Sequence, residues 1–171
     1  MLALILGFAI VVLDQFTKIW VREAFVYGGE PQAVIPGFFN LVYVRNPGAA
    51  WGMLGGQQVI LIGLSIVVLI LLAIFHRRVL NPTLDHRIAL GLMIGGILGN
   101  LIDRIKFGWV TDFLDFHIGT HHWPSFNIAD SAICIAVGLY LLSALWHKSH
   151  PLKNDGGNDE IPKHEGSSKS E

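Results

Sequence analysis

Four long apolar segments alternate with more polar ones along the chain. The apolar segments cover residues 2–20, 58–75, 88–105 and 126–146. Each has about the ~20 residues with which an α-helix crosses the hydrocarbon core of a bilayer. The pattern therefore predicts an all-α integral membrane protein with four transmembrane helices, contained in a single domain over residues 1–147.

The segment between the first two predicted spans has a different character. Residues 28–56 are interrupted by turn-forming pairs such as Pro36-Gly37 and Pro47-Gly48. Between these pairs, residues 38–44 are rich in aromatic and β-branched side chains, which favours a strand, and residues 33–35 favour a shorter one. We expect a small β-sheet region here, lying on one face of the membrane.

The charges between the spans predict the orientation of the chain. His76, Arg77 and Arg78 end the second span, and a short link leads to Arg87. Basic loops stay in the cytoplasm, so four spans place both termini there. The region 28–56 and the loop 106–125 then share the outer face. Residues 148–171 are polar and rich in Gly, Ser, Lys, Asp and Glu, which predicts a disordered cytoplasmic tail.

The composition narrows the function classes. The chain has 171 residues, of which 52% are hydrophobic and 15% charged, which is unlike a typical soluble domain. No basic block indicates nucleic acid as a partner. The one cysteine, Cys134, excludes an intramolecular disulfide and a multi-cysteine zinc site.

Two carboxylates stand at the edges of the last two spans. Asp112 lies just beyond the end of the third, and Asp130 lies near the start of the fourth. If both segments cross the membrane, the loop between them brings both carboxylates to the same face. Two Asp side chains at one site cannot both ionise cheaply, so one keeps a proton. An acid and a base around a water are the groups that amide hydrolysis needs.

Other polar side chains are predicted to reach the same layer. Asp14 and Lys18 are four residues apart and able to pair on one helix face. Ionisable side chains at membrane depth normally face the protein interior or a polar cavity. The polar residues that fall in the outer half of the predicted spans, or just outside them, are Asp14, Asn46, Asn100, Asp103, Arg104, Asp112, Asn127 and Asp130.

Two other function classes are compatible with the residues alone. Membrane carboxylates also occur in proton relays, so a proton-coupled transporter or channel component is an alternative, as is a structural membrane subunit. His117, His121 and His122 suggest a metal, but the sequence has no HExxH motif and we predict no metal site. Asp115 competes with Asp112 as a candidate and is interpreted as a solvated or capping carboxylate.

Five ordered motifs resemble those of bacterial lipoprotein signal peptidase, also called signal peptidase II. They read DQFTK (14–18), RNPGAAWG (45–52), GGILGNLIDR (95–104), VTDF (110–113) and FNIAD (126–130). The resemblance implies a membrane aspartyl endopeptidase, in the bacterial cytoplasmic (inner) membrane, with its active site toward the outer face. It implies cleavage of prolipoproteins on the N-terminal side of a diacylglyceryl-modified cysteine, without metal or cofactor.

The resemblance also implies roles for particular residues. Asp112 and Asp130 would form the catalytic dyad. The residues that would bind substrate or support the site are Asp14, Lys18, Asn46, Asn100, Asp103, Arg104 and Asn127. Membrane lipids would surround the enzyme, and cyclic peptides of the globomycin type would block it.

Overall fold

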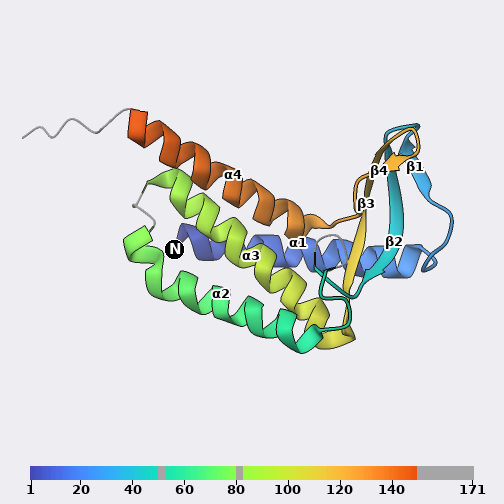
Figure 1. Cartoon of the computed structure of the whole chain (residues 1–171), viewed down its shortest axis with the longest axis horizontal. Helices are drawn as coiled ribbons and strands as arrows, with labels where there is room; N and C mark the ends of the chain where they lie inside the picture. Colours follow the sequence, from blue (N-terminus) through green and yellow to red (C-terminus); the bar gives the residue numbers. More distant parts are fainter. Residues whose placement is uncertain (50–52, 80–82, 150–171) are drawn as a thin grey trace, which may run out of the picture.

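The computed structural model describes residues 1–49, 53–79 and 83–149 (Figure 1). Its helices are α1 (Leu2–Ala24), α2 (Gln58–Val79), α3 (Leu84–Phe107) and α4 (Ile128–Ser149). All four are long and apolar enough to cross a membrane, which confirms the predicted helices. A helix satisfies its backbone polar groups internally, as a lipid environment requires. The tail predicted for residues 148–171 lies almost wholly outside the described residues.

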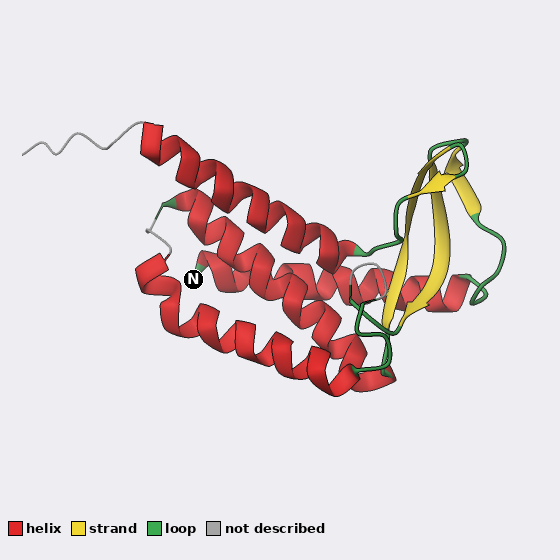
Figure 2. Cartoon of the chain, viewed as in Figure 1, coloured by secondary structure: helices red, strands yellow, loops and turns green. Residues whose placement is uncertain are grey.

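A four-stranded antiparallel sheet lies across one end of the helices (Figure 2). Its strands, in spatial order, are β1 (Gln32–Ile35), β2 (Phe39–Asn46), β3 (Val110–Ile118) and β4 (His121–His122). The N-terminus and the described end of α4 both lie at the opposite end of the helices (Figure 1). The small sheet predicted from residues 33–44 is therefore confirmed.

The interpretation of residues 106–125 as a loop is wrong. Residues 110–118 form β3, which pairs with β2 from Phe39↔Phe116 to Asn46↔Val110. The physical reason is that β2 offers a row of unpaired backbone groups, which a second strand satisfies. Two acidic side chains of β3 are held by side-chain amides of β2. Asn40 donates to Asp115, and Asn46 donates to Asp112.

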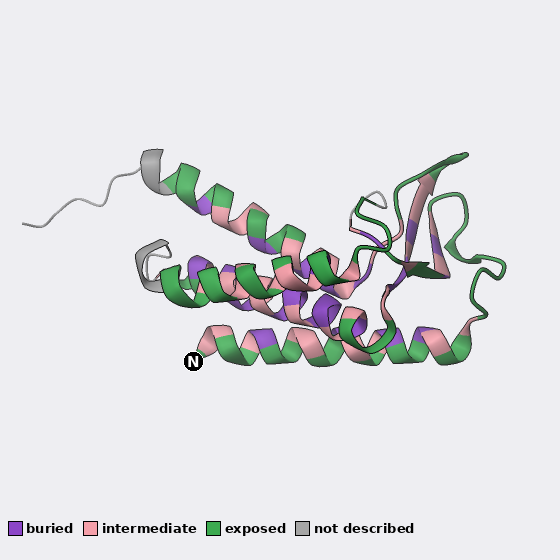
Figure 3. Ribbon diagram, turned by 60° about the horizontal axis from the view of Figure 1, so that its bottom comes forward, coloured by how far each residue is buried: buried purple, intermediate pink, exposed green. Residues whose placement is uncertain are grey.

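Helix α3 is the centre of the bundle and packs against α1, α2 and α4. Glycines make the closest of these contacts possible, because a residue without a side chain lets two helix backbones approach. A Cβ atom on Gly95 would lie 2.7 Å from the carbonyl oxygen of Gly7 in α1, and one on Gly96 would lie 2.5 Å from that of Ala129 in α4. Buried residues gather where the helices meet, while the outward faces are exposed (Figure 3). Many of the exposed residues are large and apolar. An apolar exterior is what a lipid environment favours.

Candidate active site

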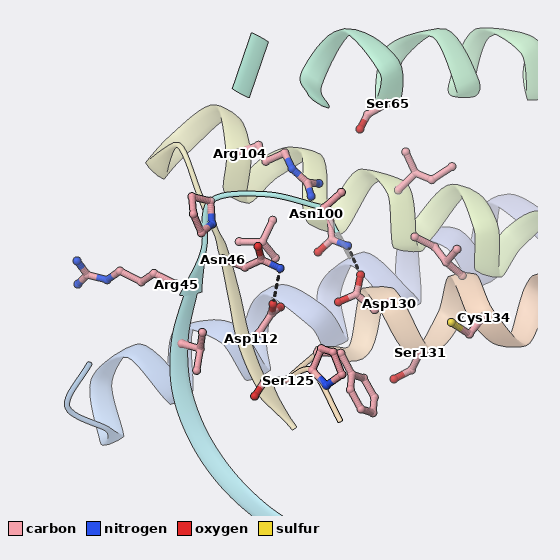
Figure 4. A pocket seen from close by; sticks show the side chains of 18 of the residues that line it. Arg45, Asn46, Ser65, Asn100, Arg104, Asp112, Ser125, Asp130, Ser131 and Cys134 are labelled. Atoms are coloured by element: carbon pink, nitrogen blue, oxygen red, sulfur yellow. Dashed lines mark hydrogen bonds between the residues drawn. The ribbon is translucent and has the colours of Figure 1, made fainter. Parts of the chain in front are cut away.

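A cavity of about 810 Å³ lies where the sheet meets the helices (Figure 4). Its walls come from β2, β3, α2, α3, α4 and the segment 123–126 that leads into α4. Asp112 and Asp130 both line it, together with Asn46, Asn100 and Arg104. The structure thus brings these five predicted site residues, from four separate elements, to one cavity.

Asp112 is held at both carboxylate oxygens by side-chain amides. Asn46 Nδ2 donates to its Oδ2 at 3.0 Å, and Asn127 Nδ2 donates to its Oδ1 at 2.7 Å. The side chain is only 2% exposed. Burial raises the pKa of Asp112 to about 7, the neighbouring charge of Asp130 adds to the rise, and the two amides oppose it. Asp112 therefore gains and loses its proton near neutral pH.

Asp130 is fixed by the N-terminus of α4. The Asn127 side chain accepts the backbone N–H of Asp130 at 3.0 Å, and Asp130 Oδ2 accepts the backbone N–H of Asn127 at 3.2 Å. This reciprocal pattern is a capping box, built here from Asn and Asp. The other oxygen, Oδ1, accepts Asn100 Nδ2 at 2.7 Å. The motif that starts the helix therefore also aims a carboxylate into the cavity.

A buried ionic network stands behind the cavity, between α1 and α3. Lys18 Nζ lies 2.9 Å from Asp14 Oδ2 and 3.5 Å from Asp103 Oδ2, and all three side chains are fully buried. The predicted pairing of Asp14 with Lys18 is thus confirmed. Asp14 also accepts the backbone N–H of Ala129 at 3.0 Å, which ties α1 to the start of α4.

Asp103 and Arg104 point in different directions. Asp103 accepts the backbone N–H of Thr111 at 3.0 Å and so joins α3 to β3. Arg104 lines the cavity, and its Nη2 donates to the carbonyl oxygen of Gly48 at 3.2 Å. The turn after β2 is thereby tied to α3.

Asp115 lies three residues beyond Asp112, which places it on the other face of β3. It accepts Asn40 Nδ2 at 2.9 Å and lies 2.8 Å from His122 Nδ1. Burial alone would raise the pKa of Asp115, but the contacts with His122 and Asn40 lower it. Asp115 therefore fastens β4 to the sheet, away from the cavity. Within the described part of the chain, no group of three His, Cys, Asp or Glu residues is arranged to hold a metal.

Sequence reasoning missed several residues of this region. Gln15 donates to Asp103 and to the carbonyl oxygen of Gly99, and Arg22 donates to Thr111. Their spacing from Asp14 and Lys18 offered a signal, because Arg22 follows Lys18 by one helical turn. Ser65 lines the cavity from α2, a helix in which the sequence analysis named no candidate residue. Ser65 is a rare polar residue in that span, and this was the available signal.

Comparisons with known proteins point to one family of membrane peptidases. The family model described as Signal peptidase (SPase) II matches residues 6–146. The lipoprotein signal peptidase of Syntrophus aciditrophicus (strain SB) is 47% identical over 141 residues, covering 80% of this chain and 87% of the relative. That of Syntrophotalea carbinolica is 44% identical over 144 residues, covering 82% and 88%. A bacterial membrane enzyme solved by the in meso method at 2.3 Å resolution is 35% identical, with a TM-score of 0.82 and coverage of 90% and 93%.

Proposed function

Because this chain belongs to the lipoprotein signal peptidase (signal peptidase II) family, we propose that Asp112 and Asp130 are the catalytic pair of an aspartic peptidase. The family assignment makes the chain a bacterial membrane enzyme with prolipoprotein substrates. It also sets aside the transporter alternative. The finer statements that follow are proposals about residues, substrate chemistry and orientation.

One observation carries the assignment of the catalytic pair. Two carboxylates from different elements line the same cavity, and each is held at both oxygens by hydrogen-bond donors. Such a pair favours one shared proton, because two adjacent negative charges repel. The pKa of about 7 at Asp112 supports a singly protonated pair at neutral pH.

The proposed reaction is a direct hydrolysis by water. The ionised carboxylate takes a proton from water as its oxygen bonds to the scissile carbonyl carbon. The protonated carboxyl group donates a hydrogen bond to the developing oxyanion. The C–N bond then breaks as the leaving nitrogen receives a proton from the pair. The products are a carboxylic acid and an amine, and the pair returns to one shared proton.

The apolar part of the cavity lining supports a lipid-modified substrate. Ser65 of α2 lies on one wall, Cys134 of α4 on another, and Ile97 and Ile133 add apolar surface (Figure 4). We propose that the diacylglyceryl-modified cysteine enters sideways from the bilayer, with its acyl chains remaining in lipid. Cleavage falls on the N-terminal side of that cysteine. Cyclic peptides of the globomycin type would occupy the same space.

A cleavage assay tests the catalytic pair. Purified protein in detergent is given a lipid-modified prolipoprotein, and wild type is compared with Asp112→Asn and Asp130→Asn, each with and without a metal chelator. Asn keeps the shape but cannot share the proton, so we expect a loss of roughly 100-fold or more in kcat, with no effect of the chelator.

Asp115→Asn is the matched control, because it removes a carboxylate of the same strand that lies outside the cavity. It is expected to keep most of the activity. Cleavage by Asp112→Asn at the wild-type rate, or inactivation of the wild type by the chelator, would contradict the proposal.

A further inference from the structure

A fully buried lysine is connected to the catalytic pair through a single amide. Lys18 Nζ contacts Asp14 and Asp103, and it also donates to Asn100 Oδ1 at 2.9 Å. The same Asn100 donates from Nδ2 to Asp130 Oδ1 at 2.7 Å. The contacts form one continuous line from the ionic network of α1 and α3 to a carboxylate in the cavity, and Figure 4 shows its last link, from Asn100 to Asp130.

The lysine fixes which way the Asn100 amide points. An ammonium group has donors and no acceptor, so the side of the amide that faces it must be the oxygen. Asn127 Nδ2 reinforces this choice by donating to the same oxygen at 3.2 Å. The amide nitrogen is therefore turned toward Asp130. Without the ammonium group, a flipped amide would present its oxygen to the carboxylate and repel it.

The two catalytic carboxylates consequently have different surroundings. Asp130 receives an amide N–H that a cation polarises, and a backbone N–H at a helix N-terminus, where negative charge is favoured. Asp112 receives two side-chain amides on a strand. The other charged groups near the pair are Asp14 from α1, Asp103 and Arg104 from α3, and Arg45 from β2, which also lines the cavity. Arg104 interacts with both carboxylates, and the charge of Lys18 also opposes the rise in the pKa of Asp112.

We propose, resting on the proposed function, that Lys18 is a positioning residue that acts through Asn100 to make Asp130 the ionised, water-activating member of the pair. Asp112 is then the protonated member, which donates a hydrogen bond to the scissile carbonyl oxygen. Lys18 itself touches neither substrate nor water in the reaction. The high pKa of Asp112 is in keeping with this division of roles.

A double-mutant cycle in an Asp14→Asn background tests the proposal. This background is needed because removing Lys18 alone would leave the buried Asp14 carboxylate without its cation. A neutral asparagine side chain at position 14 needs no cation. Asp103 keeps Arg22, 3.8 Å away. The cycle compares Asp14→Asn with the same chain carrying Lys18→Met, Asn100→Ala or both. Thermal unfolding in detergent shows that each variant is folded, and kcat, KM and pH profiles are measured on a lipid-modified prolipoprotein.

If Lys18 acts through Asn100, each single step lowers kcat by about 10- to 100-fold with little change in KM, as expected for one hydrogen bond to a charged group. The variant with both changes is then no slower than the one with Asn100→Ala alone. The acid limb of the kcat/KM profile moves to higher pH in each, because the ionised carboxylate has lost its donor.

Losses that multiply, or a pH profile that stays in place, would overturn the proposal and leave Lys18 with a packing role. This failure is separate from that of the proposed function. Asp130→Asn remains inactive if only the role of Lys18 is wrong, and it cleaves normally if the catalytic pair is wrong.

Discussion

At the scale of single residues, Asp112 couples the site to the stability of the fold. Its pKa is about 7 in the folded chain and near 3.8 in the unfolded one, chiefly because it is buried. A raised pKa means that folding favours the protonated form. The resulting stabilisation is complete below about pH 4 and is lost as pH rises through about 7. The folded state in which Asp112 is ionised is therefore less stable than the one in which it keeps its proton.

Replacing this carboxyl group removes the pH dependence. We expect the stability of Asp112→Asn relative to wild type to increase between pH 4 and pH 8, by at most about 4 kcal/mol for a shift of roughly three pKa units. Thermal unfolding midpoints in detergent across this range measure it. Asp115→Asn is the control, since the pKa of Asp115 is lowered and its contribution is lost only at acid pH. A constant offset between Asp112→Asn and wild type would contradict the expectation.

At the scale of elements, the close packing of α3 against α4 positions the site. Gly96 faces Ala129 and Ile133, one residue before and three after Asp130, and a Cβ atom there would lie 2.5 Å and 2.7 Å from them. Gly96→Ala must push α4 outward, which we expect to cost about 1–3 kcal/mol of stability. It should also lower kcat by lengthening the contact between Asn100 and Asp130.

Gly138→Ala is the matched control on α4. A Cβ atom at Gly138 meets nothing within 4 Å, so this change should be neutral or slightly stabilising through helix propensity. Both variants are compared by thermal unfolding and by prolipoprotein cleavage. Equal behaviour of the two would mean that the α3–α4 contact does not position the carboxylates.

The elements also show what the sequence could and could not predict. The helices were predictable because each apolar run is long enough to identify itself without reference to the rest of the chain. Strand β3 was not, because its pairing partner lies far away along the chain: Asn46 and Asp112, which are hydrogen-bonded, are separated by 66 positions in the sequence. The five sequence motifs were sufficient to name the candidate residues of the site. The direction of the Asn100 amide, and the opposite facing of Asp112 and Asp115, required the pairing and packing to be known.

At the scale of the whole molecule, the site lies at the boundary between two layers. The helices present apolar surfaces that suit lipid, and the sheet covers the end opposite the N-terminus (Figure 1). A lipid-modified substrate has its acyl chains in the bilayer, beside the helices, and its peptide at the membrane surface, beside the sheet. A cavity lined by both β2 and β3 and by α2, α3 and α4 therefore meets both parts of such a substrate.

This arrangement predicts which side of the membrane each layer faces. The basic residues at the end of α2 favour the cytoplasm, so the sheet should lie on the outer side. In a Cys134→Ser chain, Glu30→Cys places a thiol in the exposed segment before β1, and Leu84→Cys places one at the opposite end, where α3 begins. A membrane-impermeant maleimide added to spheroplasts should label the first thiol at once and the second only after permeabilisation. Retained cleavage of prolipoprotein shows that both chains are folded. The reverse labelling pattern would place the cavity on the cytoplasmic side and would contradict the proposed orientation. A substrate that has already crossed the membrane could not present its modified cysteine to a cavity on that side.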